Sequence, residues 1–267
     1  MTILKWLLVV AITGYGGLLA LMYLLQRSIM YPAPQTVRTA PAAAGFPQAQ
    51  EVVLDTSDGE KVIAWHVPPK EGKPVVIFFH GNGEVLAWRE PRFRELVADG
   101  TGLVALSFRG YAGSSGKPSE AGLIADGEAA YQFAATRYPA ARIVPWGFSL
   151  GSGVAVALAA RHPVGKLILE APYTSTVELA ASAFPFLPVR WLLLDRFHSD
   201  ERIGNVHVPL LVMHGARDTV VPIAMGERLF ALANEPKRLV RFPQGDHINL
   251  TEQGAVKIVW EFLAERP

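Results

Sequence analysis

A serine stands in the middle of the stretch Gly147-Phe148-Ser149-Leu150-Gly151, with a glycine two positions away on each side. The preceding letters, ARIVPWGF, are typical of a buried strand, and the following LGSGVAVALAARH is typical of a small-residue helix. A tight strand-to-helix turn strains the residue at its apex and leaves no room for side chains two positions before and after it. The pattern therefore predicts that Ser149 projects from a sheet edge. The alternative is a Gly/Ser-rich turn without a chemical role, which would have the same sequence pattern.

Nucleophilic catalysis by a serine needs a base that removes the hydroxyl proton and an acid that orients the base. The stretch VMHGARDTVVP places Asp218 just beyond a predicted strand, and FPQGDHINL places His247 before the last predicted helix. Singly, Asp218 would cap a helix and His247 would be an ordinary loop residue. Together with Ser149 they predict a Ser–Asp–His triad. Glu170, at the end of KLILE, is a second candidate acid or a carboxylate that anchors a loop, and Asp218 is favoured.

Acyl transfer also needs donors for the oxyanion that develops on the carbonyl oxygen. The N–H of Leu150, at the start of the predicted helix, is one candidate donor. The other is the N–H of Asn82 in the loop HGNGE, which follows the predicted strand PVVIFF. Gly81 and Gly83 let the backbone turn inward there, although a Gly-rich turn without chemistry is the alternative. We expect Asn82 and Leu150 to form an oxyanion hole.

The elements that would position these groups alternate along the chain. EVVLDT and KVIAWHV flank SDGE and predict a hairpin, and PVVIFF is typical of a strand that is buried on both faces. Later apolar runs at 103–108, 142–148, 166–170, 209–214 and 238–243 are separated by helical patterns. Such alternation predicts an α/β fold with a mostly parallel, doubly wound sheet, which binds ligands beyond the C-terminal strand ends.

An apolar run without a charged residue extends from Trp6 to Leu25. As a helix it would be about 30 Å long, the thickness of the hydrocarbon core of a bilayer. Trp6 and Tyr23 lie near its ends, where aromatic rings favour the membrane interface. A cleaved signal peptide would need a small-residue cleavage site, which LLQRSIMYPAP lacks, and a buried core helix would carry more polar residues. We expect residues 1–30 to be a single-pass membrane anchor.

Three further segments follow the anchor. Residues 31–50 contain four prolines and many alanines and predict an extended linker, and residues 51–267 form the expected catalytic domain. Within it, residues 174–206 are rich in Phe, Leu and Trp and interrupt the strand pattern. They predict a short cap over the site, with ordinary helix packing as the alternative. Lys5 precedes the apolar run and Arg27 follows it, so these charges do not decide on which side of the membrane the catalytic domain lies. An extracytoplasmic domain is slightly favoured.

Composition excludes several classes of function. The 25 basic and 24 acidic residues give a net charge of +1, without the clustered Lys and Arg of a nucleic-acid surface. The absence of cysteine excludes disulfides, thiolate metal sites and a cysteine nucleophile. His80 and His214, each before a glycine, could hold a metal with His247, but a role in shaping loops is favoured. We expect neither a metal nor a cofactor.

The stretches FFHGNG, FRGYAGSSGKPSEAGL, GFSLGSGVA, HGARDTVVP and GDHINL, in this order, resemble the α/β-hydrolase superfamily. More closely, they are similar to its serine-aminopeptidase-like branch of membrane-anchored lipases, lysophospholipases and protein depalmitoylases. HGNGE is shorter than the small-residue stretch that relatives often carry at this place. The roles that the resemblance implies are those of nucleophile, acid, base and two oxyanion donors, for Ser149, Asp218, His247, Asn82 and Leu150 respectively.

This resemblance implies a membrane-anchored serine hydrolase that cleaves small-molecule or lipid esters or thioesters with an apolar acyl group. A short apolar cap and a membrane anchor favour such a substrate. Two alternatives stay open: a serine aminopeptidase or amidase, which would need a carboxylate pocket for a free amine, and a non-catalytic member that binds a lipid or a partner. Arg109 could contact an anionic substrate group, although a structural salt bridge is favoured, and Asp126 is expected to be a structural anchor.

Overall fold

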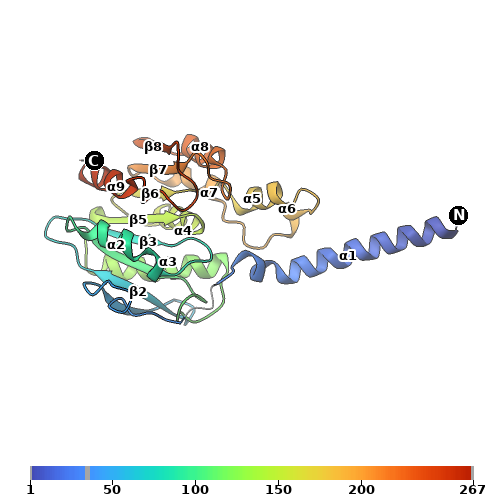
Figure 1. Ribbon diagram of the computed structural model, residues 1–267, viewed down its shortest axis with the longest axis horizontal. Coiled ribbons are helices and arrows are strands. Elements are labelled where there is room, and N and C mark those ends of the chain that lie inside the picture. The colour runs from blue at the N-terminus through green and yellow to red at the C-terminus, as the bar shows by residue number, and fades with distance from the viewer. Residues whose placement is uncertain (1, 34–36, 266–267) are drawn as a thin grey trace.

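A sheet of eight strands forms the centre of the molecule, and the computed structural model describes residues 2–33 and 37–265 (Figure 1). The strand order is β1-β2-β4-β3-β5-β6-β7-β8. β1 and β2 are antiparallel to each other, and β2 is antiparallel to β4. The remaining neighbours in the sheet are parallel, namely β4, β3, β5, β6, β7 and β8. The strands are β1 Gln50–Asp55, β2 Lys61–Val67, β3 Val75–Phe79, β4 Gly102–Ser107, β5 Ile143–Phe148, β6 Leu167–Glu170, β7 Leu210–Gly215 and β8 Lys237–Phe242.

Helices cover both faces of this sheet, which makes the predicted doubly wound architecture. The core on one face joins the sheet to α3, α4 and α8, and the core on the other face joins it to α2 and α9. The main helices are α1 Thr2–Met30, α2 Glu90–Val97, α3 Glu120–Ala135, α4 Leu150–Ala159, α5 Thr176–Ala183, α6 Val189–Leu192, α7 Ser199–Arg202, α8 Ile223–Leu232 and α9 Ala255–Ala264. Short 3-10 turns span Leu86–Arg89, Ala140–Arg142 and Ile203–Asn205.

The central strand β3 shows why an uninterrupted apolar run was needed. All five of its residues are buried, with Val75, Ile77 and Phe79 in one core and Val76 and Phe78 in the other. Side chains alternate between the faces of a strand, so a strand with helices on both sides must be apolar throughout. The same holds for β5, whose last residue precedes Ser149.

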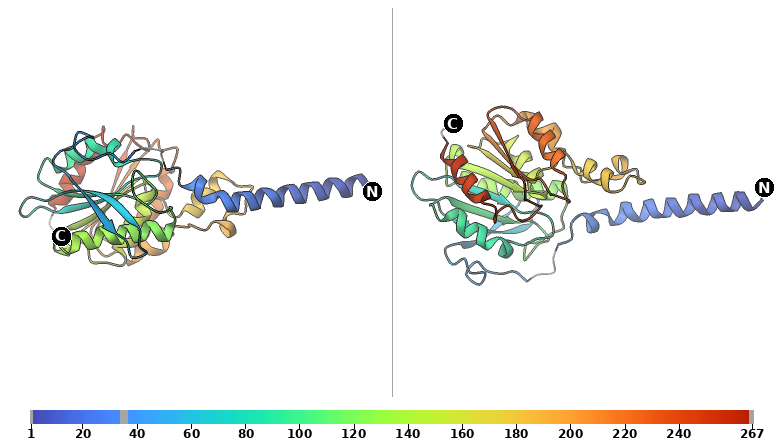
Figure 2. Two further views of the ribbon diagram at one scale, coloured as in Figure 1. Left: turned by 90° about the horizontal axis from the view of Figure 1, so that it is seen from below. Right: turned by 45° about the horizontal axis from the view of Figure 1, so that its top comes forward.

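The long helix α1 projects from the domain at the side where α5 and α6 lie (Figures 1 and 2). It spans 29 residues, and by length and composition it is suited to cross a membrane. Its N-terminal part points away from the rest of the chain, whereas its second half runs beside the α5–α6 segment in each view. The hydroxyl of Tyr15 donates a hydrogen bond of 2.8 Å to the carbonyl oxygen of Phe186 in that segment.

The segment after α1 contacts the domain, although residues 31–50 were expected to be an extended linker. Phe46 is fully buried, and its ring lies 6.3 Å from the rings of Trp65 and Phe93. Tyr31 is also buried. Part of the expected linker, residues 34–36, lies outside the described residues. The described part therefore packs on the surface of the sheet's first strands rather than extending away from them.

Candidate active site

Ser149 is the single residue between β5 and α4, and its backbone has a strained conformation with φ 49° and ψ −116°. A non-glycine residue at positive φ is uncommon and marks a turn that its surroundings hold in place. A Cβ atom on Gly147 would lie 2.4 Å from Gly151 O, and one on Gly151 would lie 2.2 Å from Phe79 O. Both glycines are therefore required by close backbone approach, as the sequence pattern predicted.

His247 lies between Ser149 and Asp218. Its Nε2 is 3.0 Å from Ser149 Oγ, and its Nδ1 is 2.7 Å from Asp218 Oδ2. These distances are those of a nucleophile hydrogen-bonded to a base and of a base hydrogen-bonded to its orienting acid. The three predicted residues come from the ends of β5, β7 and β8, and the fold brings them together at the carboxyl edge of the parallel sheet.

Asp218 is held in place by further hydrogen bonds. Its Oδ1 accepts from the backbone N–H groups of Val220 and Val221, each at 2.8 Å. The Nε2 atom of His214 lies 2.9 Å from Val221 O and 3.4 Å from Asp218 Oδ2. Burial raises the pKa of Asp218, but hydrogen bonds from His214 and His247 and the charge of His247 outweigh it. The pKa of Asp218 therefore lies well below its ordinary value, and the carboxylate stays charged near neutral pH.

The hydrogen-bond partners of the Glu170 carboxylate are Arg92 and Trp146, not His247. It is fully buried, and Arg92 donates two hydrogen bonds to its carboxylate, at 2.7 and 2.8 Å. Trp146 Nε1 donates a third, at 3.2 Å. The backbone oxygen of Glu170 accepts the N–H of Ser149 at 2.9 Å. Glu170 thus supports the serine turn, which matches the loop-anchoring alternative rather than the role of acid.

The two predicted oxyanion donors border one cavity together with Ser149. Leu150 is the first residue of α4, where backbone N–H groups have no partner within the helix. The side chain of Asn82 is fixed at both ends: Tyr111 donates to its Oδ1 at 2.8 Å, and its Nδ2 donates to Met30 O at 2.6 Å. Glu84 accepts the N–H of Gly81 and so braces the same loop from within.

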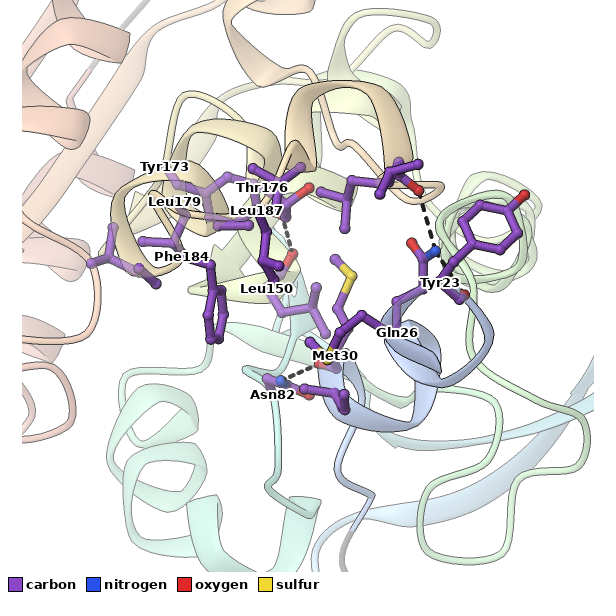
Figure 3. A pocket seen from close by; sticks show the side chains of 18 of the residues that line it. Tyr23, Gln26, Met30, Asn82, Leu150, Tyr173, Thr176, Leu179, Phe184 and Leu187 are labelled. Atoms are coloured by element: carbon purple, nitrogen blue, oxygen red, sulfur yellow. Dashed lines mark hydrogen bonds between the residues drawn. The ribbon is translucent and has the colours of Figure 1, made fainter. Parts of the chain in front are cut away.

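The cavity has a volume of about 340 Å³ and a mostly apolar wall (Figure 3). Ser149 and Asn82 are among its lining residues, and so are Leu179, Phe184 and Leu187 of the predicted cap. Side chains of α1 close the remaining side. No Asp or Glu is among the described residues that line the cavity. Such a wall suits an apolar group and offers no carboxylate to a positively charged one.

Comparison with known proteins places this chain in a family. The family model described as serine aminopeptidase, S33 matches residues 70–201. The uncharacterized protein Rv2307c of Mycobacterium tuberculosis is 37% identical over 243 residues, which are 90% of this chain and 86% of that protein. The chain belongs to the α/β-hydrolase superfamily.

This α/β-hydrolase is also similar to a lipase and to solved esterases. The lysophosphatidylserine lipase ABHD12 of Danio rerio is 30% identical over 238 residues, which cover 74% of this chain and 62% of the lipase. The Pyrococcus furiosus esterase Pf2001 superposes with a TM-score of 0.70 at 21% identity, covering 86% of this chain and 97% of the esterase. The second similarity concerns the fold alone.

The remaining candidates of this α/β-hydrolase have structural partners. Arg109 is bound on both sides, donating at 2.8 Å to Asp126 and at 2.6 and 2.9 Å to Asp58. His80 is fully buried: its Nε2 accepts the N–H of Phe108 at 3.2 Å and its Nδ1 lies 2.6 Å from Gly81 O. Burial lowers the pKa of His80, in keeping with a neutral ring that shapes the loop HGNGE.

Sequence reasoning missed three residues that position this site. Tyr111 holds Asn82, Met30 accepts from Asn82, and Arg92 neutralises Glu170. Tyr111 lies in the quoted stretch FRGYAGSSG, but no spacing rule connects it to the loop HGNGE. Met30 and Arg92 carried no signal, because their partners are 52 and 78 residues away along the chain.

Proposed function

We propose that this α/β-hydrolase is a serine hydrolase that cleaves carboxylic esters or thioesters with an apolar acyl group. The observation that carries the proposal is the position of His247, whose two ring nitrogens lie 3.0 Å from Ser149 Oγ and 2.7 Å from Asp218 Oδ2. That arrangement allows Ser149 to lose its proton as its oxygen attacks a carbonyl carbon. It supports acyl transfer without a cofactor.

The proposed reaction has two halves. Ser149 Oγ bonds to the carbonyl carbon while His247 Nε2 takes the hydroxyl proton, and the resulting oxyanion accepts hydrogen bonds from the N–H groups of Asn82 and Leu150. Collapse breaks the ester or thioester bond, and the alcohol or thiol leaves with the proton from His247. Water then gives a proton to His247 and attacks the acyl-enzyme. The bond to Ser149 Oγ breaks, His247 returns the proton to that oxygen, and the carboxylic acid is released.

Asp218 keeps the imidazole in the tautomer that presents an unprotonated Nε2 to Ser149 and stabilises the imidazolium that forms. Its lowered pKa supports this role, because the carboxylate stays charged whenever His247 takes up the proton. The orientation is reinforced by Phe148, whose ring centroid lies 5.2 Å from that of His247.

The apolar wall of the cavity supports an acyl chain as the group that is bound. Its volume of about 340 Å³ falls within the roughly 300–1,000 Å³ that small-molecule sites occupy. A relative that is named as a lysophosphatidylserine lipase supports a lipid ester. Peptide amides are the second candidate, because the matching family model carries the name serine aminopeptidase. The absence of Asp and Glu among the described lining residues favours the ester, since a free amine would lack a counter-charge.

A fluorophosphonate probe and a panel of substrates test the proposal. The full chain in detergent is expected to bind the probe covalently and to hydrolyse acyl esters or thioesters faster than peptide amides. Ser149→Ala should lose both labelling and hydrolysis. Ser152→Ala is the matched control, because the hydroxyl of Ser152 is fully buried and donates to Ser149 O at 2.6 Å. Labelling of Ser149→Ala at another serine would refute the proposed nucleophile, and faster cleavage of amides would favour the peptidase.

A further inference from the structure

One face of α1 forms part of the wall of the cavity that contains Ser149. Leu19, Met22, Gln26 and Met30 are half-buried, whereas the other described residues of this helix are exposed. The spacing of three, four and four residues places these side chains on a single helical face. Tyr23 and Ile29 extend the same face, and Figure 3 shows Gln26, Met30 and Tyr23 opposite the cap. The helix therefore does more than connect the domain to a membrane.

Hydrogen bonds hold α1 against the cap along half of its length. Gln26 makes two of them, donating to Leu192 O at 3.2 Å and accepting from Leu194 N at 2.8 Å. Arg27 binds the buried carboxylate of Asp195 through two further bonds, at 2.8 and 2.9 Å. Together with the bond from Tyr15 to the cap, these contacts fix how the helix lies relative to the cavity.

The end of the cap that is farthest from the sheet lies beside a part of α1 that belongs to its apolar run. Tyr15, which contacts the cap at Phe186, precedes Leu25 by about 15 Å of helix. This is half of the roughly 30 Å thickness of a hydrocarbon core. The cap exposes a large apolar side chain at this level, since Phe186 is 64% exposed, and a second one, Trp191, which is 84% exposed, stands next to Leu192, the partner of Gln26. A surface of this kind beside an apolar helix matches the hydrocarbon of a single leaflet.

The cap segment 184–194 contains one charged residue, Arg190, which is exposed. An arginine can bury its aliphatic stem in the acyl region while its guanidinium extends to the headgroups. Its presence is therefore compatible with insertion into the outer part of a leaflet. Arg27 and Asp195 neutralise each other at the base of the cap, nearer the sheet.

We propose that the cap inserts beside α1 into one bilayer leaflet, and that the acyl chain of a membrane lipid enters the cavity sideways, between α1 and α5–α6. The membrane helix is then a wall of the acyl-binding site. This proposal rests on the proposed function, because it concerns the substrate of Ser149. It assigns to Met22 and Leu19 contacts with the acyl chain, and to the exposed side chains Phe186 and Trp191 contacts with lipid.

Met22→Trp tests the wall, with Leu21→Trp as the matched control. Leu21 is 53% exposed and lies on the opposite face of the helix. In the full chain reconstituted in phosphatidylcholine vesicles, Met22→Trp should lower kcat/KM for a long-chain monoacyl lipid ester about tenfold or more. Hydrolysis of a soluble butyrate ester and labelling of Ser149 should fall much less than hydrolysis of the long-chain ester, because a short acyl group contacts less of the cavity wall. Leu21→Trp should leave all three measurements unchanged.

Other outcomes of that experiment have distinct meanings. Equal effects of Met22→Trp and Leu21→Trp on the long-chain ester would overturn the proposed wall. A loss by Met22→Trp that is the same for both chain lengths would overturn it as well, since α1 would then act on the fold rather than on the acyl chain. Absence of butyrate hydrolysis and labelling in the unaltered chain would refute the proposed function itself.

A nitroxide label tests the insertion of the cap. The chain contains no cysteine, so Phe186→Cys gives a single labelling site, and Glu71→Cys, in the exposed turn before β3, is the control. In the same vesicles, the label at 186 should collide with oxygen and be protected from a water-soluble nickel complex, whereas the label at 71 should meet the nickel complex. Exposure of label 186 to nickel would place the cap in water, and shielding from both reagents would indicate a protein partner. Either result would overturn the proposal.

Discussion

Arg92 donates two hydrogen bonds, of 2.7 and 2.8 Å, to the carboxylate of Glu170, and both side chains are almost completely buried. The guanidinium of Arg92 also lies 5.4 Å from the ring of Trp146. This pairing satisfies the charge of Glu170 and directs it away from His247. It separates two acids that the sequence leaves as rivals, because Glu170 is the last residue of β6 and Asp218 follows the neighbouring parallel strand β7.

The two acids should therefore respond differently to neutral substitution. Asp218→Asn should lower kcat by about four orders of magnitude, because the amide favours the wrong imidazole tautomer. Glu170→Gln should keep most of its turnover per folded molecule and lose about 3–5 kcal/mol of stability, because the charge of Arg92 would remain buried without a partner. Steady-state kinetics on protein whose folded fraction is known from thermal unfolding would measure both effects. The reverse ranking of kcat would reassign the acid to Glu170.

Tyr111 is expected to act through Asn82. Tyr111→Phe removes the hydrogen bond of 2.8 Å to Asn82 Oδ1 and loosens the loop that carries the proposed oxyanion donor. Loss of one such bond is worth about 0.5–1.5 kcal/mol, so kcat should fall about two- to tenfold while KM changes little. Tyr131→Phe is a matched control, since that hydroxyl binds Pro163 O at 2.9 Å in another part of the fold. An equal fall of kcat in the two variants would mean that Tyr111 contributes to stability only.

Gly151 should tolerate no side chain. The Cβ of Gly151→Ala would meet Phe79 O at 2.2 Å and His80 O at 2.8 Å, and these are backbone atoms that cannot rotate away. We expect a loss of at least about 1–3 kcal/mol of stability and slower labelling of Ser149, because α4 and the end of β3 would be forced apart. Gly204→Ala controls for the substitution, since its Cβ would meet no atom within 4 Å. Thermal unfolding and the rate of probe labelling compare the two variants, and equal values would contradict the steric argument.

The sheet and the positions of Ser149, Asp218 and His247 could be predicted because local patterns determine them. Buried parallel strands must be apolar on both faces, and the serine turn demands glycines at 147 and 151, so each leaves a mark in a few consecutive letters. The neighbourhood of the three residues then follows from the rule that parallel strands end at one edge. In the structure His247 and Ser149 are 98 positions apart in the chain but hydrogen-bonded.

The wall of the cavity could not be predicted in the same way. The sequence of α1 is apolar, and this would be expected both if Met22 contacted a bound acyl chain and if it contacted the bilayer. Both environments favour the same side chains, so the sequence does not distinguish them. The link from Asn82 to Met30 depends on where α1 ends relative to the loop after β3, which no local pattern encodes. The burial of Phe46 could not be predicted either, because this residue lies among the alanines and prolines of the expected linker.

The pH dependence of stability should carry a contribution from Asp218. Its pKa is lowered in the folded chain, because the hydrogen bonds from His214 and His247 outweigh the effect of burial. A lowered carboxyl pKa means that the unfolded chain takes up a proton first as the pH falls. The stabilisation is therefore fully present above the ordinary aspartate pKa of about 4 and is lost progressively below it. The difference in unfolding temperature between the native chain and Asp218→Asn should be present at about pH 5 and should shrink below about pH 4. Asp55→Asn, at an exposed carboxylate beside Lys61, controls for removal of a charge. If the difference for Asp218→Asn does not change with pH while both proteins unfold reversibly, the hydrogen bonds to Asp218 do not favour its charged form.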